Sequence, residues 1–152
     1  MPRPRTLKLG TLTLPNMLPD TFFARHLSVF APDQAKTPIT IIGCGAVGSM
    51  TAFALSKIGC SNLTLYDHDT IEELNIPPQF FHPGQLGQNK AFATASNLKY
   101  FMDTDSTAHA KKWDFETWTE TPIVIVAVDT MATRRAIYDQ LKTRLGLRLM
   151  IE

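Results

Sequence analysis

The residues best suited to chemistry are three glycines and a later aspartate. Gly43, Gly45 and Gly48 have the spacing G-x-G-x-x-G, and Asp67 follows roughly 20 residues later. In a nucleotide-binding turn the first glycine allows a tight turn, the second lets a phosphate approach the backbone, and the third lets a helix pack close to a strand. An acidic side chain at this distance can accept a hydrogen bond from a ribose hydroxyl. The spacing predicts a nucleotide site, and a glycine-rich structural turn is the alternative.

Regular elements on both sides must position these glycines. Residues 39–42 are uncharged and mostly β-branched, which is typical of a strand buried on both faces. A helix is predicted over 46–58, ending at Gly59, and a second strand over 63–66. The helix has apolar residues at roughly helical spacing, namely Val47, Met50, Ala54, Leu55 and Ile58.

Composition narrows the class of protein. The 152 residues suffice for one domain, and 44% hydrophobic with 19% charged residues favours a folded domain over disorder. A net charge of +1 provides no basic field for nucleic acid, and no apolar segment is long enough to cross a membrane. Cys44 and Cys60 are too few for a disulfide framework or a four-thiolate zinc site, so we expect no zinc. The N-terminus lacks the apolar segment of a signal peptide, and we expect a cytoplasmic protein.

The chain divides into an N-terminal arm with a short helix, residues 1–37, and a Rossmann-like domain, residues 38–152. In the arm we predict a short strand over 8–14 and a helix over 21–30 that Asp20 could cap. We interpret this segment as an arm that packs over one edge of the sheet, and a separate binding element is the alternative.

Alternating strand and helix patterns continue after Asp67. An irregular loop precedes a helix over 88–101, a weak strand over 106–112, a buried strand over 123–128, a helix from Thr130 to about residue 145, and a last strand from 147. Aromatic residues between the third and fourth strands are more suited to covering the sheet than to stacking on a base: Trp113, Phe115 and Trp118. This order predicts an α/β fold with a mostly parallel sheet and helices on both faces. Ligands of such sheets bind beyond the carboxyl ends of the strands, which would hold the glycines, Asp67 and Asp129.

Four blocks of sequence suggest a family. They are GCGAVGS, NLTLYDHDTIEELNIPPQFF, LGQNKA and VAVDTMATRR. In this order and spacing they resemble the ThiF/MoeB/HesA-like adenylating proteins, relatives of the ubiquitin-activating enzymes. The resemblance implies that ATP and Mg²⁺ are bound. It also implies that the C-terminal glycine carboxylate of a small ubiquitin-like or sulfur-carrier protein attacks the α-phosphorus, giving an acyl-adenylate and pyrophosphate. Some members of the family dimerise, and by this resemblance a homodimer is expected.

The resemblance also assigns roles to individual residues. Lys90 and Asp129 would be catalytic, with Asp129 the Mg²⁺ ligand, because a hard cation favours carboxylate oxygen. Arg25 is the candidate for an arginine that reaches the ATP of a partner subunit, and Arg134 would be structural. The nucleotide-binding residues implied in this way are Gly43, Gly45, Gly48, Asp67, Asp69, Asn75, Gln79, Lys90, Asp129 and Thr130.

Two departures from the family pattern affect function. Pro78 stands where the family has an arginine that clamps the triphosphate, and such a cation commonly contributes roughly 10²-fold to rate. No cysteine lies where thioester-forming members carry one, and Cys44 and Cys60 are expected to be small buried residues. The chain would then be a truncated or split adenylation domain, without the family's carrier-binding half.

Three alternatives share the opening motif. A non-catalytic ATP- or adenylate-binding interaction module would explain the missing arginine, and a NAD-dependent oxidoreductase or a methyltransferase could use the same glycine turn. Asp67, His68 and Asp69 also resemble a metal cluster. Because adjacent strand residues point to opposite sides, we expect these three not to converge on one ion.

Overall fold

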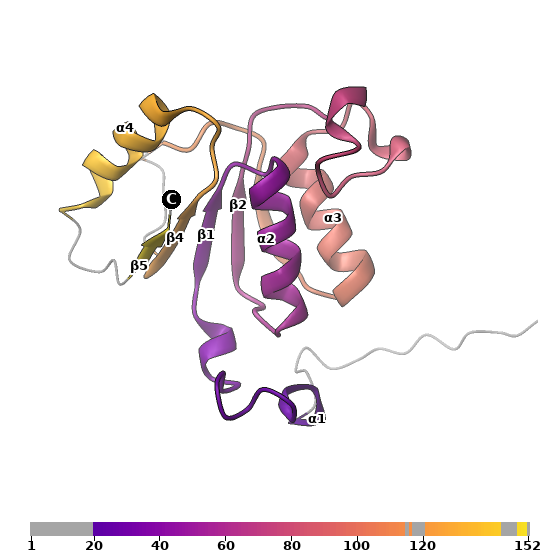
Figure 1. The fold of residues 1–152 in the computed structure, drawn as a ribbon, viewed down its shortest axis with the longest axis vertical. Helices are drawn as coiled ribbons and strands as arrows, with labels where there is room; N and C mark the ends of the chain where they lie inside the picture. The colour runs from indigo at the N-terminus through magenta and orange to yellow at the C-terminus, as the bar shows by residue number, and fades with distance from the viewer. Residues whose placement is uncertain (1–19, 115, 117–120, 144–148, 152) are drawn as a thin grey trace, which may run out of the picture.

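The computed structural model describes residues 20–114, 116, 121–143 and 149–151, and a parallel sheet forms its centre (Figure 1). The five strands lie in the order β3-β2-β1-β4-β5, and every neighbouring pair is parallel. They are β1 (Ile39–Ile42), β2 (Leu63–Tyr66), β3 (Ser106–His109), β4 (Ile123–Val126) and β5 (Leu149–Ile151). This order places β1, which leads into the glycines, at the middle of the sheet. The predicted α/β class is confirmed.

Helices cover both faces of this sheet, as predicted. In Figure 1, α2 and α3 lie against one face and α4 against the other. The helices are α1 (Asp20–Phe23), α2 (Ala46–Lys57), α3 (Lys90–Met102) and α4 (Met131–Leu141), with 3₁₀ turns at η1 (Gln34–Lys36), η2 (Glu73–Asn75) and η3 (Pro83–Gln85). Among the described residues, no helix is long and apolar enough to cross a membrane.

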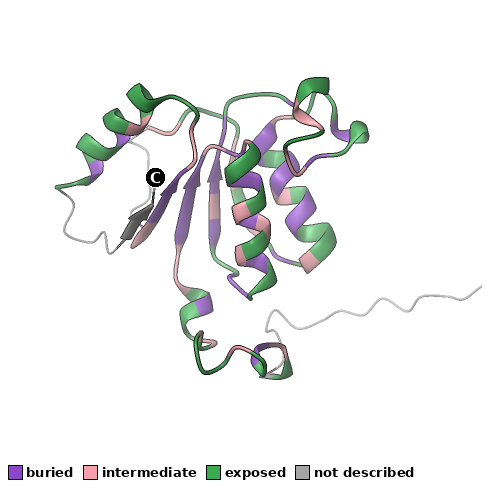
Figure 2. Ribbon diagram, in the orientation of Figure 1, coloured by how far each residue is buried: buried purple, intermediate pink, exposed green. Residues whose placement is uncertain are grey.

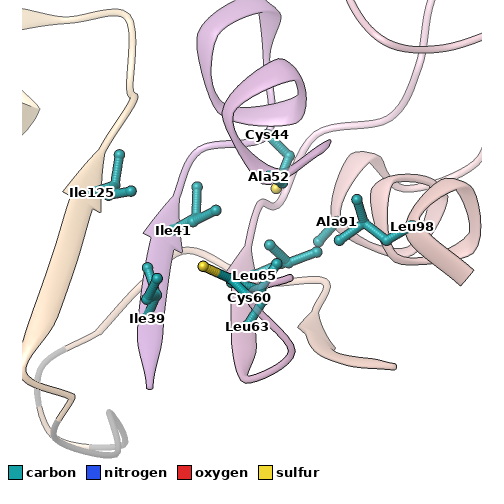
Figure 3. Close-up of a cluster of buried hydrophobic side chains, with 10 residues drawn as sticks. All are labelled: Ile39, Ile41, Cys44, Ala52, Cys60, Leu63, Leu65, Ala91, Leu98 and Ile125. Atoms are coloured by element: carbon teal, nitrogen blue, oxygen red, sulfur yellow. The ribbon is translucent and has the colours of Figure 1, made fainter. Parts of the chain in front are cut away.

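The core has two layers because successive strand residues point to opposite faces. Ile39 and Ile41 of β1 join Leu63 and Leu65 of β2 against α2 and α3, in the cluster shown in Figure 3. On the other face a second cluster packs against α4, and its members are Ile42, Tyr66, Val124, Val126, Ile137 and Leu141. The central strands are therefore buried on both sides (Figure 2). Fully burying one such side chain contributes about 1.5–3 kcal/mol.

The face that α2 turns to the sheet consists of small residues, which the apolar pattern did not predict. Gly48, Ser49, Ala52 and Ser56 are buried, whereas Val47 is 64% exposed. Met50, Ala54 and Ile58 are exposed as well. At the start of α2 the cause is the close approach to the glycine turn, where a Cβ atom at Gly48 would meet the Gly43 carbonyl, and Leu55 further along packs beside the small residues.

The predicted helix over 21–30 is wrong beyond Phe23. Phe23 is buried, but Leu27 and Val29 are exposed, and the chain continues in turns such as the one from His26 to Val29. Of the later apolar residues, Phe30 is partly buried against the core cluster of β1 and β2. The segment of α1 also lies beyond the amino ends of the strands, not along an edge of the sheet (Figure 1). The predicted strand over 8–14 lies outside the described residues.

The other predicted elements exist with shorter bounds. The strand over 106–112 ends at 109, the strand over 123–128 ends at 126, and the helix from Thr130 ends at Leu141. No helix lies between β3 and β4 in the part of the chain that the structure describes. Trp113 packs against the α4-side cluster, as expected for a residue that covers the sheet. Phe115 and Trp118 lie outside the described residues.

The small-residue face of α2 can be tested with two alanines of the same helix. Ala52 is fully buried and Ala54 is exposed. We expect Ala52→Leu to lower the free energy of unfolding by about 1–3 kcal/mol, because added methyl groups overpack the contact with the sheet. The same change at Ala54 should alter it by less than about 0.5 kcal/mol. Urea unfolding followed by circular dichroism measures both, and equal effects would contradict this packing.

Candidate nucleotide site

Apart from Arg25, the predicted site residues lie at the carboxyl-end edge of the sheet. The glycine turn follows β1, Asp67 follows β2, and Asp129 follows β4. The loop between β2 and α3 begins at the same edge and contains Asp69, Asn75 and Gln79. Because β1 lies between β2 and β4, the turn lies between the two carboxylates.

The glycine turn has the geometry that its spacing predicts. Gly43 has a φ of 92°, which favours glycine, and its N–H donates to the Tyr66 carbonyl at 2.8 Å. A Cβ atom at Gly48 would lie only 1.8 Å from the Gly43 carbonyl oxygen, so this position needs a glycine. A Cβ atom at Gly45 would meet nothing within 4 Å. The turn is thus closely packed on one side and open on the other.

The open side is the N-terminus of α2. Gly45 is the N-cap residue and offers no side chain to cap the helix. The first N–H groups of a helix have no partner within the helix and carry a partial positive charge. An uncapped helix start with space in front of it suits a phosphate group.

Asp67 fixes the turn to the end of β2. Its side chain is buried, and Oδ2 accepts a hydrogen bond from the Cys44 N–H at 2.6 Å. Oδ1 accepts from the Asp69 N–H at 2.8 Å. Each oxygen keeps a second lone pair, so the predicted contact with a ribose hydroxyl stays a prediction. The observed contacts hold two backbone segments together.

Lys90 and Asp69 form an ion pair at the start of α3. The Lys90 Nζ lies 3.3 Å from Asp69 Oδ2, and the lysine side chain is only 10% exposed whereas that of Asp69 is 52% exposed. The Lys90 N–H also donates to the Asp69 carbonyl. The pair lies in a polar cavity of about 360 Å³, which is lined by His68, Asp69, Thr70, Glu72, Asn75 and Lys90. The cavity therefore holds three of the predicted site residues: Asp69, Asn75 and Lys90.

Asn75 and Gln79 lie on the loop beside this cavity. The Asn75 Oδ1 accepts from the Glu72 N–H at 3.0 Å, and the Gln79 N–H donates to the Asn75 carbonyl at 3.1 Å. The Gln79 Oε1 atom is buried and has no hydrogen-bond partner among the described residues. Buried polar atoms are almost always bonded, so this acceptor lacks the partner that such atoms normally have. Pro78, beside it, is exposed.

The β4 side of the site contains Asp129 and Thr130. Asp129 is exposed, as a carboxylate that binds a cation from solvent would be. The Thr130 hydroxyl caps α4 by accepting a hydrogen bond from the Thr133 N–H at 3.3 Å. The role in nucleotide binding expected of Thr130 stays a prediction. The Arg134 Nε donates to the Val128 carbonyl at 2.8 Å, which is the structural contact expected of it.

Asn89 is a positioning residue that we did not predict. Its Oδ1 caps α3 by accepting from the Ala91 N–H at 2.9 Å, and its Nδ2 donates to the carbonyls of Asp67 and Asp69 at 3.0 Å each. One side chain therefore fixes the start of α3, and with it Lys90, to the end of β2. The signal was present in the sequence, because asparagine immediately before a helix is a preferred N-cap.

The side chains of Asp67, His68 and Asp69 lie closer together than the alternation of a strand predicts. Their ligand atoms lie within 4.8 Å of one another, and His68 Nε2 is 3.3 Å from Asp69 Oδ1. The alternation of a strand does not apply to them, because β2 ends at Tyr66. We assign no metal here, since exposed acidic groups commonly lie close together without an ion.

Both cysteines are buried, as expected. Burial, and then the nearby Asp67 carboxylate, raise the pKa of the Cys44 thiol far above its ordinary value. Burial also raises the pKa of Cys60. Since the thiolate is the reactive form, neither side chain is suited to act as a nucleophile.

Arg25 lies away from this edge in its own chain. It follows α1, which is beyond the amino ends of the strands and so at the opposite end of the sheet (Figure 1). Its predicted contact with ATP would need a second subunit and stays a prediction.

A parallel sheet of order β3-β2-β1-β4-β5 with an open glycine turn after its central strand defines a Rossmann-like domain of the nucleotide-binding type. Within that class the chain belongs to the ThiF family, whose family model matches residues 27–145. The matched region includes every described element from η1 to α4. The family resemblance of the four sequence blocks is confirmed.

Among curated proteins, the chain is similar to "Ubiquitin-like modifier-activating enzyme 5" of several organisms. The rice protein is 43% identical over 60 residues, which cover 40% of this chain and 14% of that protein. The Branchiostoma floridae protein is 31% identical over 123 residues, covering 65% of this chain and 29% of that protein. The chain therefore spans less than a third of the length of these relatives.

Solved structures share the fold at lower identity. E. coli MccB, solved with AMPCPP and MccA, superposes with a TM-score of 0.71 at 20% identity, covering 83% of this chain and 42% of that one. E. coli tRNA N6-threonylcarbamoyladenosine dehydratase, TcdA, gives a TM-score of 0.68 at 22% identity and covers 80% of this chain and 57% of that one. At these identities the likeness shows the fold alone.

The two sides of the glycine turn predict different effects of the same substitution. We expect Gly48→Ala to lower the free energy of unfolding by about 1–3 kcal/mol, because the new Cβ would overlap the Gly43 carbonyl. This loss would occur although alanine is intrinsically about 1 kcal/mol better than glycine inside a helix. Gly45→Ala, where the space is open, should change stability by less than about 0.5 kcal/mol. Thermal and urea unfolding measure both, and a Gly48→Ala protein as stable as the parent would contradict the close contact.

Proposed function

We propose that this domain binds Mg²⁺-ATP and adenylates the C-terminal carboxylate of a small ubiquitin-like or sulfur-carrier protein. The carboxylate oxygen would form a bond to the α-phosphorus, and the bond from that phosphorus to the bridging oxygen of the pyrophosphate would break. The observation that supports this most is the convergence of the open start of α2, the Lys90 amine and the exposed Asp129 carboxylate at one edge of the sheet. Membership of the ThiF family makes ATP the preferred nucleotide.

Each group has a task that its surroundings permit. The backbone N–H groups at the start of α2 would bind phosphate oxygens, and Gly45 leaves room for them. Lys90 would bind another phosphate, and Asp129 would hold Mg²⁺, which neutralises charge on the phosphates. Asp67 would accept from the ribose, and Asn75 and the unbonded Oε1 of Gln79 would contact the nucleotide.

The names of the relatives support the choice of partner. Proteins named for activating a ubiquitin-like modifier match the chain at up to 43% identity. MccB was solved with MccA as well as with AMPCPP. We therefore propose a protein or peptide carboxylate as the acceptor. A homodimer that brings Arg25 of one subunit to the site of the other, in the cytoplasm, completes the proposal.

Pro78 supports a second candidate function. It is exposed beside the site and carries no charge, so it cannot stabilise a departing pyrophosphate as a fixed cation would. The domain could then bind ATP or an adenylate as an interaction module without rapid transfer. A NAD-dependent oxidoreductase is disfavoured by the family match.

Nucleotide binding can be tested by thermal shift. Mg²⁺-ATP at 100 times its Kd should stabilise the domain by about 2.7 kcal/mol, and NAD⁺ should not. Asp129→Asn should remove most of this stabilisation because it removes the Mg²⁺ ligand. Asp139→Asn, also on the exposed surface but in α4 and paired with Arg135 and Lys142, serves as the control and should keep it. A shift with NAD⁺ and none with Mg²⁺-ATP would overturn the proposal.

Pyrophosphate exchange into ATP separates the enzyme from the module. We expect exchange that depends on a small carrier protein ending in Gly-Gly, measured over a panel of such proteins. Binding of ATP with no exchange for any of them would favour the module.

Introducing the missing cation should accelerate this step. Pro78→Arg is expected to raise the exchange rate by roughly 10²-fold, since a fixed cation stabilises the charge that develops on pyrophosphate. Pro77→Arg, the same change at the neighbouring exposed position, is the control and should have little effect. Equal acceleration by both variants would indicate a general effect of charge and not a clamp at position 78.

A further inference from the structure

Phe80 joins the two helices whose N-termini form the candidate site. Its N–H donates to Ser49 Oγ of α2 at 3.1 Å, and its carbonyl accepts from Asn97 Nδ2 of α3 at 2.7 Å. Its ring stacks on Phe53 of α2, with centroids 4.4 Å apart, and contacts Phe101 of α3 at 5.6 Å. Both polar backbone groups and the ring of one residue are thus held between α2 and α3.

The Ser49 hydroxyl connects this contact to the glycine turn. Besides accepting from Phe80, it donates to the Gly45 carbonyl at 2.7 Å. A hydroxyl has one hydrogen to donate and two lone pairs, so both bonds can exist together. Ser49 has no exposed surface. One buried oxygen atom therefore links the open glycine of the turn to the loop that contains Pro78 and Gln79.

The Asn97 side-chain amide is itself held by a hydrogen bond from Gln85. Gln85 Nε2 donates to Asn97 Oδ1 at 2.8 Å, and both side chains are about 95% buried. Gln85 Oε1 accepts from the His82 N–H at 3.2 Å. With its oxygen occupied by Gln85, the Asn97 amide presents its N–H group to Phe80. Asn97 lies on α3, which begins with Lys90.

We propose that Ser49 and Asn97 are positioning residues, which fix the Phe80 peptide and thereby set the distance between the glycine turn, the loop residues Asn75 and Gln79, and Lys90. The inference rests on the proposed function, because these are the groups that would surround the nucleotide. The link to the loop residues is short, since Gln79 directly precedes Phe80 and its N–H donates to the Asn75 carbonyl. Neither Ser49 nor Asn97 needs to touch the nucleotide.

The alternative is that these two residues only stabilise the fold, and α2 provides a control for that. Ser56 is also buried in α2, and its Oγ lies 2.7 Å from the Thr104 Oγ1 atom. It lies two helical turns further along α2, away from the glycine turn. Ser49→Ala and Ser56→Ala thus remove the same atom from the same helix, and each breaks a buried hydrogen bond to another segment.

The experiment measures Mg²⁺-ATP affinity by calorimetry at a temperature where every variant is folded. We expect Ser49→Ala to raise the Kd about tenfold, the equivalent of one hydrogen bond, and Ser56→Ala to leave it unchanged while lowering the melting temperature. Asn97→Ala should raise the Kd by a similar factor. It tests the same inference if Ser49→Ala fails to fold. An unchanged Kd for both Ser49→Ala and Asn97→Ala would overturn the inference.

Amide hydrogen exchange provides a readout that does not depend on the nucleotide. The Phe80 N–H should exchange faster in Ser49→Ala than in the parent protein, and at the parent rate in Ser56→Ala. If the parent protein does not bind Mg²⁺-ATP, the proposed function fails, and Phe80 exchange still tests whether the loop is held. If the parent binds, and Phe80 exchanges equally in all three proteins, the positioning role of Ser49 is wrong.

Discussion

The close approach of α2 to the glycine turn is the constraint on which the rest of the structure depends. The Gly48 position lies against the Gly43 carbonyl, with no room for a Cβ atom. This contact brings the backbone of α2 against the sheet and requires small residues along its inner face. It also leaves the first N–H groups of the helix uncapped beside Gly45. One steric contact therefore decides the packing of α2 and creates the surface that suits a phosphate.

Side-chain hydrogen bonds then fix the segments around the glycine turn to one another. Asp67 connects the turn to the segment after β2, and Asn89 connects that segment to α3. Ser49 connects the turn to Phe80 in the loop before α3. Every one of these links joins backbone groups from separate elements. Such a network fixes positions before any ligand arrives, which lowers the cost of binding.

The sequence predicts the parts of the structure that depend on local pattern. Apolar β-branched runs marked β1 and β4, the glycine spacing marked the turn, and Thr130 marked the start of α4. The failures have a common origin, because they depend on partners distant in the sequence. Most apolar positions predicted for α2 are exposed, because small residues occupy its contact with the sheet, and the arm beyond α1 exposes Leu27 and Val29. Asn89 was predictable as a cap, but its bonds to Asp67 and Asp69 and the bonds of Ser49 and Asn97 to Phe80 could not be inferred without the fold.

The candidate site divides into a fixed part and an adjustable part. Both oxygens of Asp67 accept backbone N–H groups, so this side chain cannot turn toward a ligand without breaking the link between the turn and β2. Lys90 differs, because its side chain is largely buried but its partner Asp69 is about half exposed, so water can solvate the Asp69 carboxylate if the pair opens. Asp129 is exposed, which leaves its carboxylate available as well. The charged groups proposed to bind the phosphates and Mg²⁺ thus face solvent or a solvent-exposed partner, whereas those that define the cradle are held by hydrogen bonds to backbone.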